Sequence, residues 1–178
     1  MSILKIARLG HPILFKKAKP VDDINHPSIK KLIHDMSETM LDAKGIGLAA
    51  PQVHIDKQII IFRNFEESED KNDETEIRIT ALINPKIAKI AEEENDDWEG
   101  CLSIPHMLGL VRRYSKIIFE GFDMNGNKIK NHAEGLLARV IQHEFDHLSG
   151  ILYTQRLVDL KAYGYSEEIE EYWKKKNE

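Results

Sequence analysis

The sequence predicts an α+β fold, in which several strands accompany a small number of helices. Three observations indicate it. Two segments repeat apolar residues at helical spacing, several shorter segments are rich in β-branched residues, and the two kinds do not alternate regularly as in a parallel α/β sheet. The chain has 178 residues and no internal repeat or linker, so we expect a single domain over residues 1–178.

Two amphipathic helices are expected. The first covers residues 28–43, with Ser28 as a candidate N-cap and Gly45 as the stop. Its apolar positions recur at helical spacing: Ile29, Leu32, Ile33, Met36, Met40 and Leu41. The second covers residues 136–148 and ends at Gly150.

Strands are expected at three places. Gln58 to Arg63 is a short β-branched run typical of a buried strand, and Ile79 to Ile90 carries two apolar runs. Tyr114 to Asp123 and Asn127 to His132 form the arms of a hairpin, because Asn125-Gly126 between them is a strong turn signal.

The remaining segments are more polar. Glu66 to Glu76 is acidic and predicts a solvated loop. A last helix is expected from Ser166 to Lys176, with Ser166 as the N-cap, glutamates in the first turn and lysines in the last turn, as the helix dipole favours.

Composition excludes several classes of protein. The chain is 42% hydrophobic and 31% charged, which fits a globular protein with a buried core. Its net charge is −5 with no long basic run, so direct nucleic-acid readout is not expected. No apolar run reaches the roughly 18 residues that span a bilayer, and residues 1–8 do not resemble a secretory signal. We expect no membrane association and a cytoplasmic location.

The most specific motif is His143-Glu144-Phe145-Asp146-His147, an H-E-x-x-H on the second predicted helix. Because a helical turn holds 3.6 residues, positions i and i+4 project side by side, so the two imidazoles can bind one metal ion. Glu144 then lies where its carboxylate can reach a metal-bound water.

A catalytic site of this kind needs a third protein ligand and one open position. The only cysteine is Cys101, within Glu99-Gly100-Cys101-Leu102-Ser103, so it cannot form an intramolecular disulfide. Cys101 can pack in the core as a small apolar residue, act as a nucleophile or bind a metal ion. Gly100 allows a close backbone approach, and Glu99 can orient a ligating histidine.

A third segment, Gly45-Ile46-Gly47-Leu48-Ala49-Ala50-Pro51-Gln52-Val53, contains two glycines and two alanines that let the backbone pass close to a ligand. Gln52 offers an amide donor. The segment is too short for a dinucleotide or phosphate fingerprint.

These three segments together resemble the peptide deformylase family. The family carries a glycine-rich segment that ends in glutamine, a Glu-Gly-Cys-Leu-Ser segment and a Gln-His-Glu-x-Asp-His segment, in this order. Residues 45–52, 99–103 and 142–147 match all three. Arg8-Leu9-Gly10-His11-Pro12-Ile13-Leu14 also resembles the opening segment of the family.

The resemblance implies an enzyme that removes the formyl group from N-formylmethionine at the start of new polypeptides and releases formate. It implies a central metal-ligand helix packed among mixed, mainly antiparallel strands, with one helix near the N-terminus and one near the C-terminus. The implied metal is Fe²⁺, for which Zn²⁺, Ni²⁺ or Co²⁺ can substitute. The implied roles are as follows: metal ligands Cys101, His143 and His147; general base Glu144; oxyanion donors Gln52 and the Leu102 N–H; substrate-binding residues Ile46, Gly47, Gly100 and Leu136.

Some positions depart from the family. Arg139, one turn before His143, stands where the ligand helix is commonly apolar, and the run from His106 through Leu108 to Arg113 also differs. Substrate range is therefore less defined than the chemistry. In some family members the C-terminal helix docks on the ribosome, so a transient ribosome contact is a further expectation.

Two alternatives remain from the residues alone. A zinc peptidase also uses H-E-x-x-H, but its third ligand usually lies downstream, where this chain offers only Asp159 and glutamates from Glu167 onward. A structural metal site closes all four positions with Cys or His, and a fourth ligand would have to be His106 or His132. The other histidines (His11, His26, His34, His54, His106 and His132) are expected on the surface or in loops.

Overall fold

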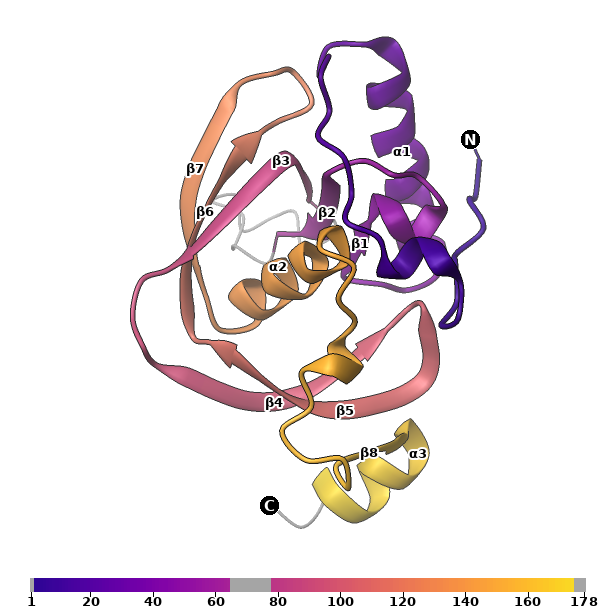
Figure 1. Cartoon of the computed structure of the whole chain (residues 1–178), viewed down its shortest axis with the longest axis vertical. Coiled ribbons are helices and arrows are strands. Elements are labelled where there is room, and N and C mark those ends of the chain that lie inside the picture. Colours follow the sequence, from indigo (N-terminus) through magenta and orange to yellow (C-terminus); the bar gives the residue numbers. More distant parts are fainter. Residues whose placement is uncertain (1, 65–77, 175–178) are drawn as a thin grey trace, which may run out of the picture.

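The computed structural model describes residues 2–64 and 78–174, and its strands and helices confirm the α+β class. The strands form two antiparallel sheets, shown in Figure 1. The first sheet has the order β1 (Gly47–Ala49), β2 (Ile59–Arg63), β3 (Ile79–Lys89), β6 (Lys116–Phe122) and β7 (Lys128–Glu134). The second has the order β4 (Glu94–Cys101), β5 (Ile104–Tyr114) and β8 (Tyr163–Tyr165).

The helices are α1 (Pro27–Asp42), α2 (Gly135–Leu148) and α3 (Ser166–Ile169). Shorter helical turns are η1 (Pro12–Phe15), η2 (Ala50–Val53), η3 (Tyr153–Gln155) and the π turn η4 (Glu170–Lys174). Within the described residues, no helix combines the length and apolar composition that crossing a membrane requires. The predicted acidic loop at Glu66 to Glu76 lies outside the described residues, and the single domain over residues 1–178 stays a prediction.

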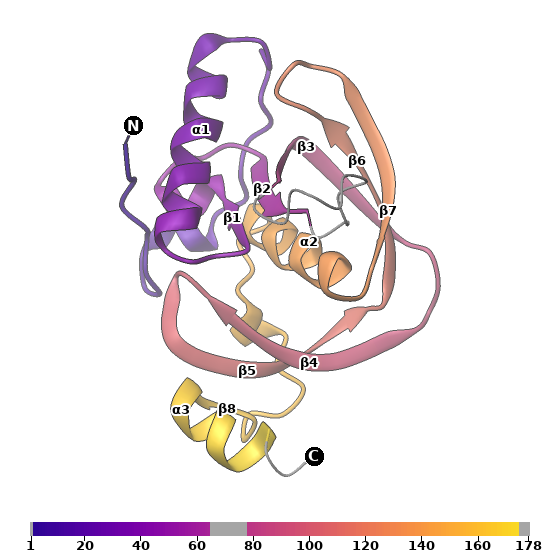
Figure 2. The same ribbon diagram turned by 180° about the vertical axis from the view of Figure 1, so that it is seen from behind.

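Strand β2 separates two helices. Ile59 and Ile61 belong to the core cluster that contains α1, whereas Ile60 and Phe62 pack in the cluster that contains α2. All four are at most 2% exposed, so the strand is buried on both faces, as its continuous apolar run predicts. Each such side chain contributes about 1.5–3 kcal/mol by burial. In both views α2 lies between the two sheets (Figures 1 and 2).

Helix α1 confirms the first predicted helix, but its caps differ. The N-cap is His26, whose side chain accepts from the Ser28 N–H, and Pro27 is the first helical residue. Proline suits that position because its missing N–H would have no partner inside the helix. Ser28 as the N-cap was therefore wrong. At the other end Lys44, with φ of 55°, takes the left-handed position.

The predicted hairpin is confirmed as β6 and β7, with Gly126 in the turn at φ of 80°. Its first arm begins later than predicted, because Tyr114 ends β5 rather than starting β6. Strand β3 covers both apolar runs of the segment from Ile79, and its register shifts between Ile83 and Lys86, where the sequence has Asn84-Pro85. The proline has no N–H for the ladder, which accounts for the irregularity.

The hairpin of β4 and β5 was not predicted. Strand β4 begins Glu-Asn-Asp-Asp and is exposed over these residues, so it shows no apolar alternation. Cross-strand pairing stabilises it instead: Arg112 donates from Nε and Nη2 to the two carboxylate oxygens of Asp96 at 2.7 and 2.8 Å.

The C-terminal helix is shorter than predicted. Helix α3 ends at Ile169 and continues as the π turn η4 to Lys174; residues 175 and 176 lie outside the described part. The N-cap is Tyr165, so Ser166 as the N-cap was wrong. Both views place α3 on the opposite side of β4 and β5 from α2 (Figures 1 and 2).

Candidate active site

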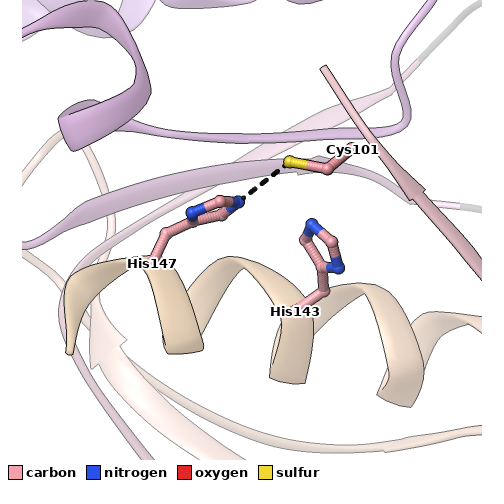
Figure 3. Close-up of side chains that lie close together, drawn as sticks. All are labelled: Cys101, His143 and His147. Carbon is pink, nitrogen blue, oxygen red and sulfur yellow. Dashed lines mark hydrogen bonds between the residues drawn. The ribbon is translucent and has the colours of Figure 1, made fainter. Parts of the chain in front are cut away.

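Three side chains from two distant segments converge on one point. His143 and His147 project from consecutive turns of α2, and Cys101 is the last residue of β4 (Figure 3). One ligand atom from each lies within 4.8 Å of the other two, and Cys101 Sγ is 3.3 Å from His147 Nε2. A tetrahedral ion with bonds of about 2.0–2.3 Å needs ligand atoms at such separations. The cluster therefore fits a divalent metal ion.

The second nitrogen of His143 supports this fit. His143 Nδ1 lies 2.9 Å from Glu99 Oε2. Because an ionised carboxylate only accepts, Nδ1 carries the hydrogen, and Nε2 has a lone pair with which it could bind a metal ion. Glu99 therefore orients His143, as its place in the sequence predicted. His147 Nδ1 is buried and has no hydrogen-bond partner among the described residues.

Glu99 is held by two buried arginines as well. Arg113 donates to both of its oxygens at 2.9 Å, and Arg139 donates to Oε1 at 2.8 Å. Burial raises the pKa of this carboxyl, but the hydrogen bonds from His143 and Arg113 outweigh burial and hold the pKa well below its usual range. Glu99 is thus an anion held in place beside His143.

The hydrogen-bond network extends away from Cys101, His143 and His147 through a buried ion pair that the sequence did not predict. Asp146, in the middle of the H-E-x-x-H motif, accepts hydrogen bonds from Arg113 and from Arg156, the latter at 2.5 and 2.7 Å. Asp146 and Arg113 are each at most 5% exposed. A buried charge needs a partner. Asp146 on the apolar second helix therefore indicated a buried cation elsewhere in the fold. Its partner Arg113 lies on β5, which the sequence did not reveal.

Glu144 packs against Gly47, and both line the same cavity as Cys101 and His143. A Cβ atom built on Gly47 would lie 2.3 Å from Glu144 Oε1, so only glycine leaves room for this carboxylate. Glu144 is 4% exposed, and its Oε2 has no hydrogen-bond partner among the described residues. Burial raises the pKa of the Glu144 carboxyl to about 7.

The amide of Gln52 has a fixed orientation. Its Oε1 accepts from the Ala49 N–H at 2.8 Å, which turns its NH₂ group toward the cluster. This group lies 3.4 Å from Cys101 Sγ and 3.2 Å from Ser103 Oγ. Gln52 is 1% exposed, so these contacts are shielded from water.

A cavity of about 570 Å³ opens onto these groups. Its lining includes Gln52, Cys101, Leu102, His143 and Glu144 and the four predicted substrate-binding residues Ile46, Gly47, Gly100 and Leu136. His147 is only 1% exposed and is not among the lining residues. Arg139 does line the cavity and is 5% exposed, so it does not face solvent.

Two sheet edges border the cavity. Ile46 O accepts from the Arg63 N–H, so ladder alternation turns the backbone N–H and C=O of Gly47 away from β2. In β4, Glu99 pairs with Gly109, and the same alternation turns the backbone of Gly100 away from β5. The backbone of Gly47 and Gly100 is thus directed to the open edges of β1 and β4.

The other histidines lie outside the cluster. His11 and His26 cap η1 and α1, and His34 and His132 are exposed. His106 is exposed but lines the cavity. His54 is half-buried and stacks edge-on against His11 with 4.6 Å between ring centroids. Neither His106 nor His132 places a ligand atom within the cluster formed by Cys101, His143 and His147.

An H-E-x-x-H helix whose third ligand comes from an upstream strand defines a class of metal-dependent hydrolase distinct from zinc peptidases with a downstream ligand. The family model for polypeptide deformylase matches residues 3–163. Peptide deformylase 1 of Bordetella pertussis is 46% identical over 162 residues, which cover 91% of this chain and 92% of that protein. The chain belongs to the peptide deformylase family, whose members use a metal ion to remove the N-formyl group from nascent peptides.

Solved structures agree with this assignment. Peptide deformylase from Thermotoga maritima superposes with a TM-score of 0.79 at 35% identity, over 89% of this chain and all of that one (100%). A class I type b peptide deformylase from Acinetobacter baumannii with bound Met-Ala-Ser gives a TM-score of 0.78 at 34% identity, over 88% of this chain and 100% of that one.

Proposed function

We propose that this chain hydrolyses the N-formyl group of N-formylmethionyl nascent peptides and releases formate, with Cys101, His143 and His147 as metal ligands. The observation that carries the proposal is the convergence of these ligand atoms within 4.8 Å, beside a buried carboxylate oxygen of Glu144 that has no partner among the described residues. A divalent ion held there supplies a Lewis acid that acidifies water and polarises a carbonyl oxygen.

The residues around the ion divide the remaining chemistry. Glu144 accepts a proton from the attacking water and returns it to the departing amine, because it is buried at the site and its Oε2 has no hydrogen-bond partner among the described residues. The formyl oxygen gains negative charge as water adds to the formyl carbon. The NH₂ of Gln52 and the backbone N–H of Leu102 donate to this oxygen.

The peptide binds as an added strand. Gly47 and Gly100 present backbone donors and acceptors from two facing sheet edges, so an extended peptide can pair with both. The carbonyl of Ile46 is already engaged with Arg63, so Ile46 contributes mainly its N–H and its side chain, which is 37% exposed. The first side chain of the substrate enters beside Leu136, Arg139 and Val140.

We propose Fe²⁺ as the working metal. Thiolate with two imidazoles suits zinc, iron(II), cobalt or nickel, and availability rather than affinity decides among them. Iron(II) beside a thiolate reacts with oxygen, so protein purified in air should lose activity while it stays folded. Nickel- or cobalt-loaded protein should be active and stable in air, and zinc-loaded protein stable but slow. Metal content per chain is measured beside specific activity. Full, air-stable activity of the zinc form would contradict the choice of iron.

Arg139 gives a prediction on specificity. Its Nη1 and Nη2 donate to Glu99, the Val111 carbonyl, and the carbonyl and side chain of Asn95, at 2.8–2.9 Å. Arg139→Leu should change the ranking of formylated peptides by their first side chain. It should also lower the free energy of unfolding by about 1–3 kcal/mol, because buried acceptors lose their donor.

Arg112→Leu is the control for Arg139→Leu, because it is the same substitution at an arginine whose side chain is 53% exposed. Its loss of stability should stay within about 1 kcal/mol. Urea unfolding gives both values. Equal losses in the two variants, with identical peptide rankings, would exclude a role for Arg139 in the pocket.

Cytoplasmic location and a transient ribosome contact follow as parts of the same proposal. The substrate is present at the ribosome as new chains emerge, and a thiolate ligand needs a reducing compartment. Direct nucleic-acid readout is not part of the proposal, because the chain has a net charge of −5 and no long basic run.

A pair of peptides tests the proposal. The protein is incubated with formyl-Met-Ala-Ser and with Met-Ala-Ser, and both formate and cleaved peptide bonds are measured. Formate from the first peptide, with no peptide-bond cleavage in either, is the expected result. Cleavage of the unformylated peptide would identify a peptidase instead. No reaction with either peptide would indicate a metal-binding protein without this activity.

A further inference from the structure

A second cavity, of about 790 Å³, adjoins the cavity of the candidate active site. Leu102 and Pro105 line both cavities, so the junction of β4 and β5 separates them. The opposite wall of the second cavity is the N-terminal segment, residues 3–8, and the end of α1 closes it on another side. None of the three proposed metal ligands is among its lining residues, so it is a separate site.

The N-terminal segment is an ordered wall of this cavity. The Ala7 N–H donates to the Gln52 carbonyl at 2.7 Å. Two residues further on, the Leu9 N–H donates to the Ser103 carbonyl at 2.8 Å. These bonds fix the backbone on both sides of Arg8, so its side chain is presented from a preorganised position.

The lining of the second cavity is rich in basic side chains. It contains Lys5, Arg8, His11 and His54, against one acidic residue, Asp42, at the end of α1. The side chains of Lys5 and Arg8 are exposed, and within the ranges that the structure describes neither has a hydrogen-bond or ion-pair partner. The cavity thus offers positive charge that is available to a ligand.

Two histidine rings meet in this lining. His11 Nδ1 accepts from the Ile13 N–H at 3.2 Å, so in the neutral ring Nε2 carries the hydrogen and is a donor. The His54 ring lies edge-on to it, with 4.6 Å between centroids, and its Nε2 is buried with no partner in the described ranges. Burial lowers the pKa of His54, and the charges of His11 and Lys5 lower it further. Positive charges therefore repel one another here, and an anion would relieve the repulsion.

We propose that the second cavity binds a small phosphate monoester, with its phosphate against Lys5, Arg8 and His11. A phosphate monoester carries about two negative charges near pH 7, so it pairs with both a guanidinium and an ammonium group, whereas a carboxylate carries only one charge. Ile6 and Leu102 are half-buried in the lining and give the organic part of the ester an apolar surface. This second site stands whether or not the chain removes formyl groups.

Calorimetric titration of the zinc-loaded full chain tests the proposal at constant ionic strength, with AMP, inorganic phosphate and acetate as probes. AMP should bind most tightly, and inorganic phosphate about 3- to 10-fold more weakly, because it leaves the apolar lining uncovered. Acetate should bind more weakly still, because it carries one charge. Equal affinities for AMP and inorganic phosphate would overturn the monoester as the ligand, and no binding of AMP would overturn the site.

A double variant locates the binding. Lys5→Gln/Arg8→Gln removes two charges from the cavity and should weaken the binding of AMP at least about 10-fold, as expected when charged hydrogen bonds are lost. Lys16→Gln/Lys17→Gln is the matched control, because it removes the same charge from two exposed residues that do not line the cavity. The control should keep the parental affinity. Equal losses in the two double variants would show a general effect of charge and overturn the site.

Histidine ring signals in nuclear magnetic resonance place the ligand independently of affinity. In the zinc-loaded protein, AMP should shift the ring ¹⁵N signals of His11 and His54. The signals of His34, which is exposed on α1, should not move. Shifts confined to His143 and His147 would place the phosphate at the metal ligands and overturn the second site.

Discussion

Glu144→Gln should leave the metal content of the protein unchanged and lower kcat by about 10²–10⁴-fold, which is the usual cost of losing a general base. The glutamine keeps the size of the side chain beside Gly47, where a Cβ would come within 2.3 Å of the Glu144 oxygen, so the pocket keeps its shape. Formate release and metal per chain are measured on the same preparation.

Glu120→Gln controls for the loss of one negative charge. Glu120 lies on β6, and its side chain is 44% exposed, so this variant should retain the parental rate. If Glu144→Gln keeps most of its activity at full metal content, Glu144 does not transfer the proton.

Gln52→Leu should lower kcat by about 10²–10³-fold with a smaller effect on KM, as expected when an oxyanion donor is lost. Leucine also leaves the Ala49 N–H without the acceptor that Gln52 Oε1 provides at 2.8 Å. The effect of this lost hydrogen bond must therefore be separated from the effect of the lost oxyanion donor.

Gln52→Glu makes this separation. Glutamate keeps an oxygen for the Ala49 N–H but cannot donate to the formyl oxygen. We expect it to lose at least as much kcat as Gln52→Leu while it stays folded at the assay temperature, and its melting temperature should fall because the new carboxylate is buried without a cationic partner. An effect confined to KM in both variants would show that Gln52 only positions the substrate.

The elements that sequence could predict are those whose apolar pattern follows from burial. Helices α1 and α2 bury one face each, and β2 is buried on both, so periodicity located them. Strand β4 could not be found in this way, because its first four residues are polar and exposed and depend on cross-strand partners from β5. The predicted N-cap of α1 was two residues late, because Pro27 is the first helical residue and His26 the cap, and that of α3 was one residue late, because Tyr165 is the cap.

The candidate site divides in the same manner. Residues that a local motif carries were predicted, and the structure brings Cys101, His143 and His147 together. The charges behind them were missed, because Arg113 and Arg156 meet Asp146 only after β5, α2 and the segment after η3 have packed. Arg139 was singled out from the sequence, but its partners Asn95 and Val111 lie on the hairpin that sequence did not reveal.

The central claim is that one metal ion at Cys101, His143 and His147 makes this chain a deformylase. Titration of metal-free protein with Ni²⁺, with formate release from formyl-Met-Ala-Ser measured at each step, tests it most directly. Activity should rise in proportion to bound metal and reach its maximum at one ion per chain, and Cys101→Ala should stay inactive throughout. Activity without bound metal, or full activity of Cys101→Ala, would contradict the account.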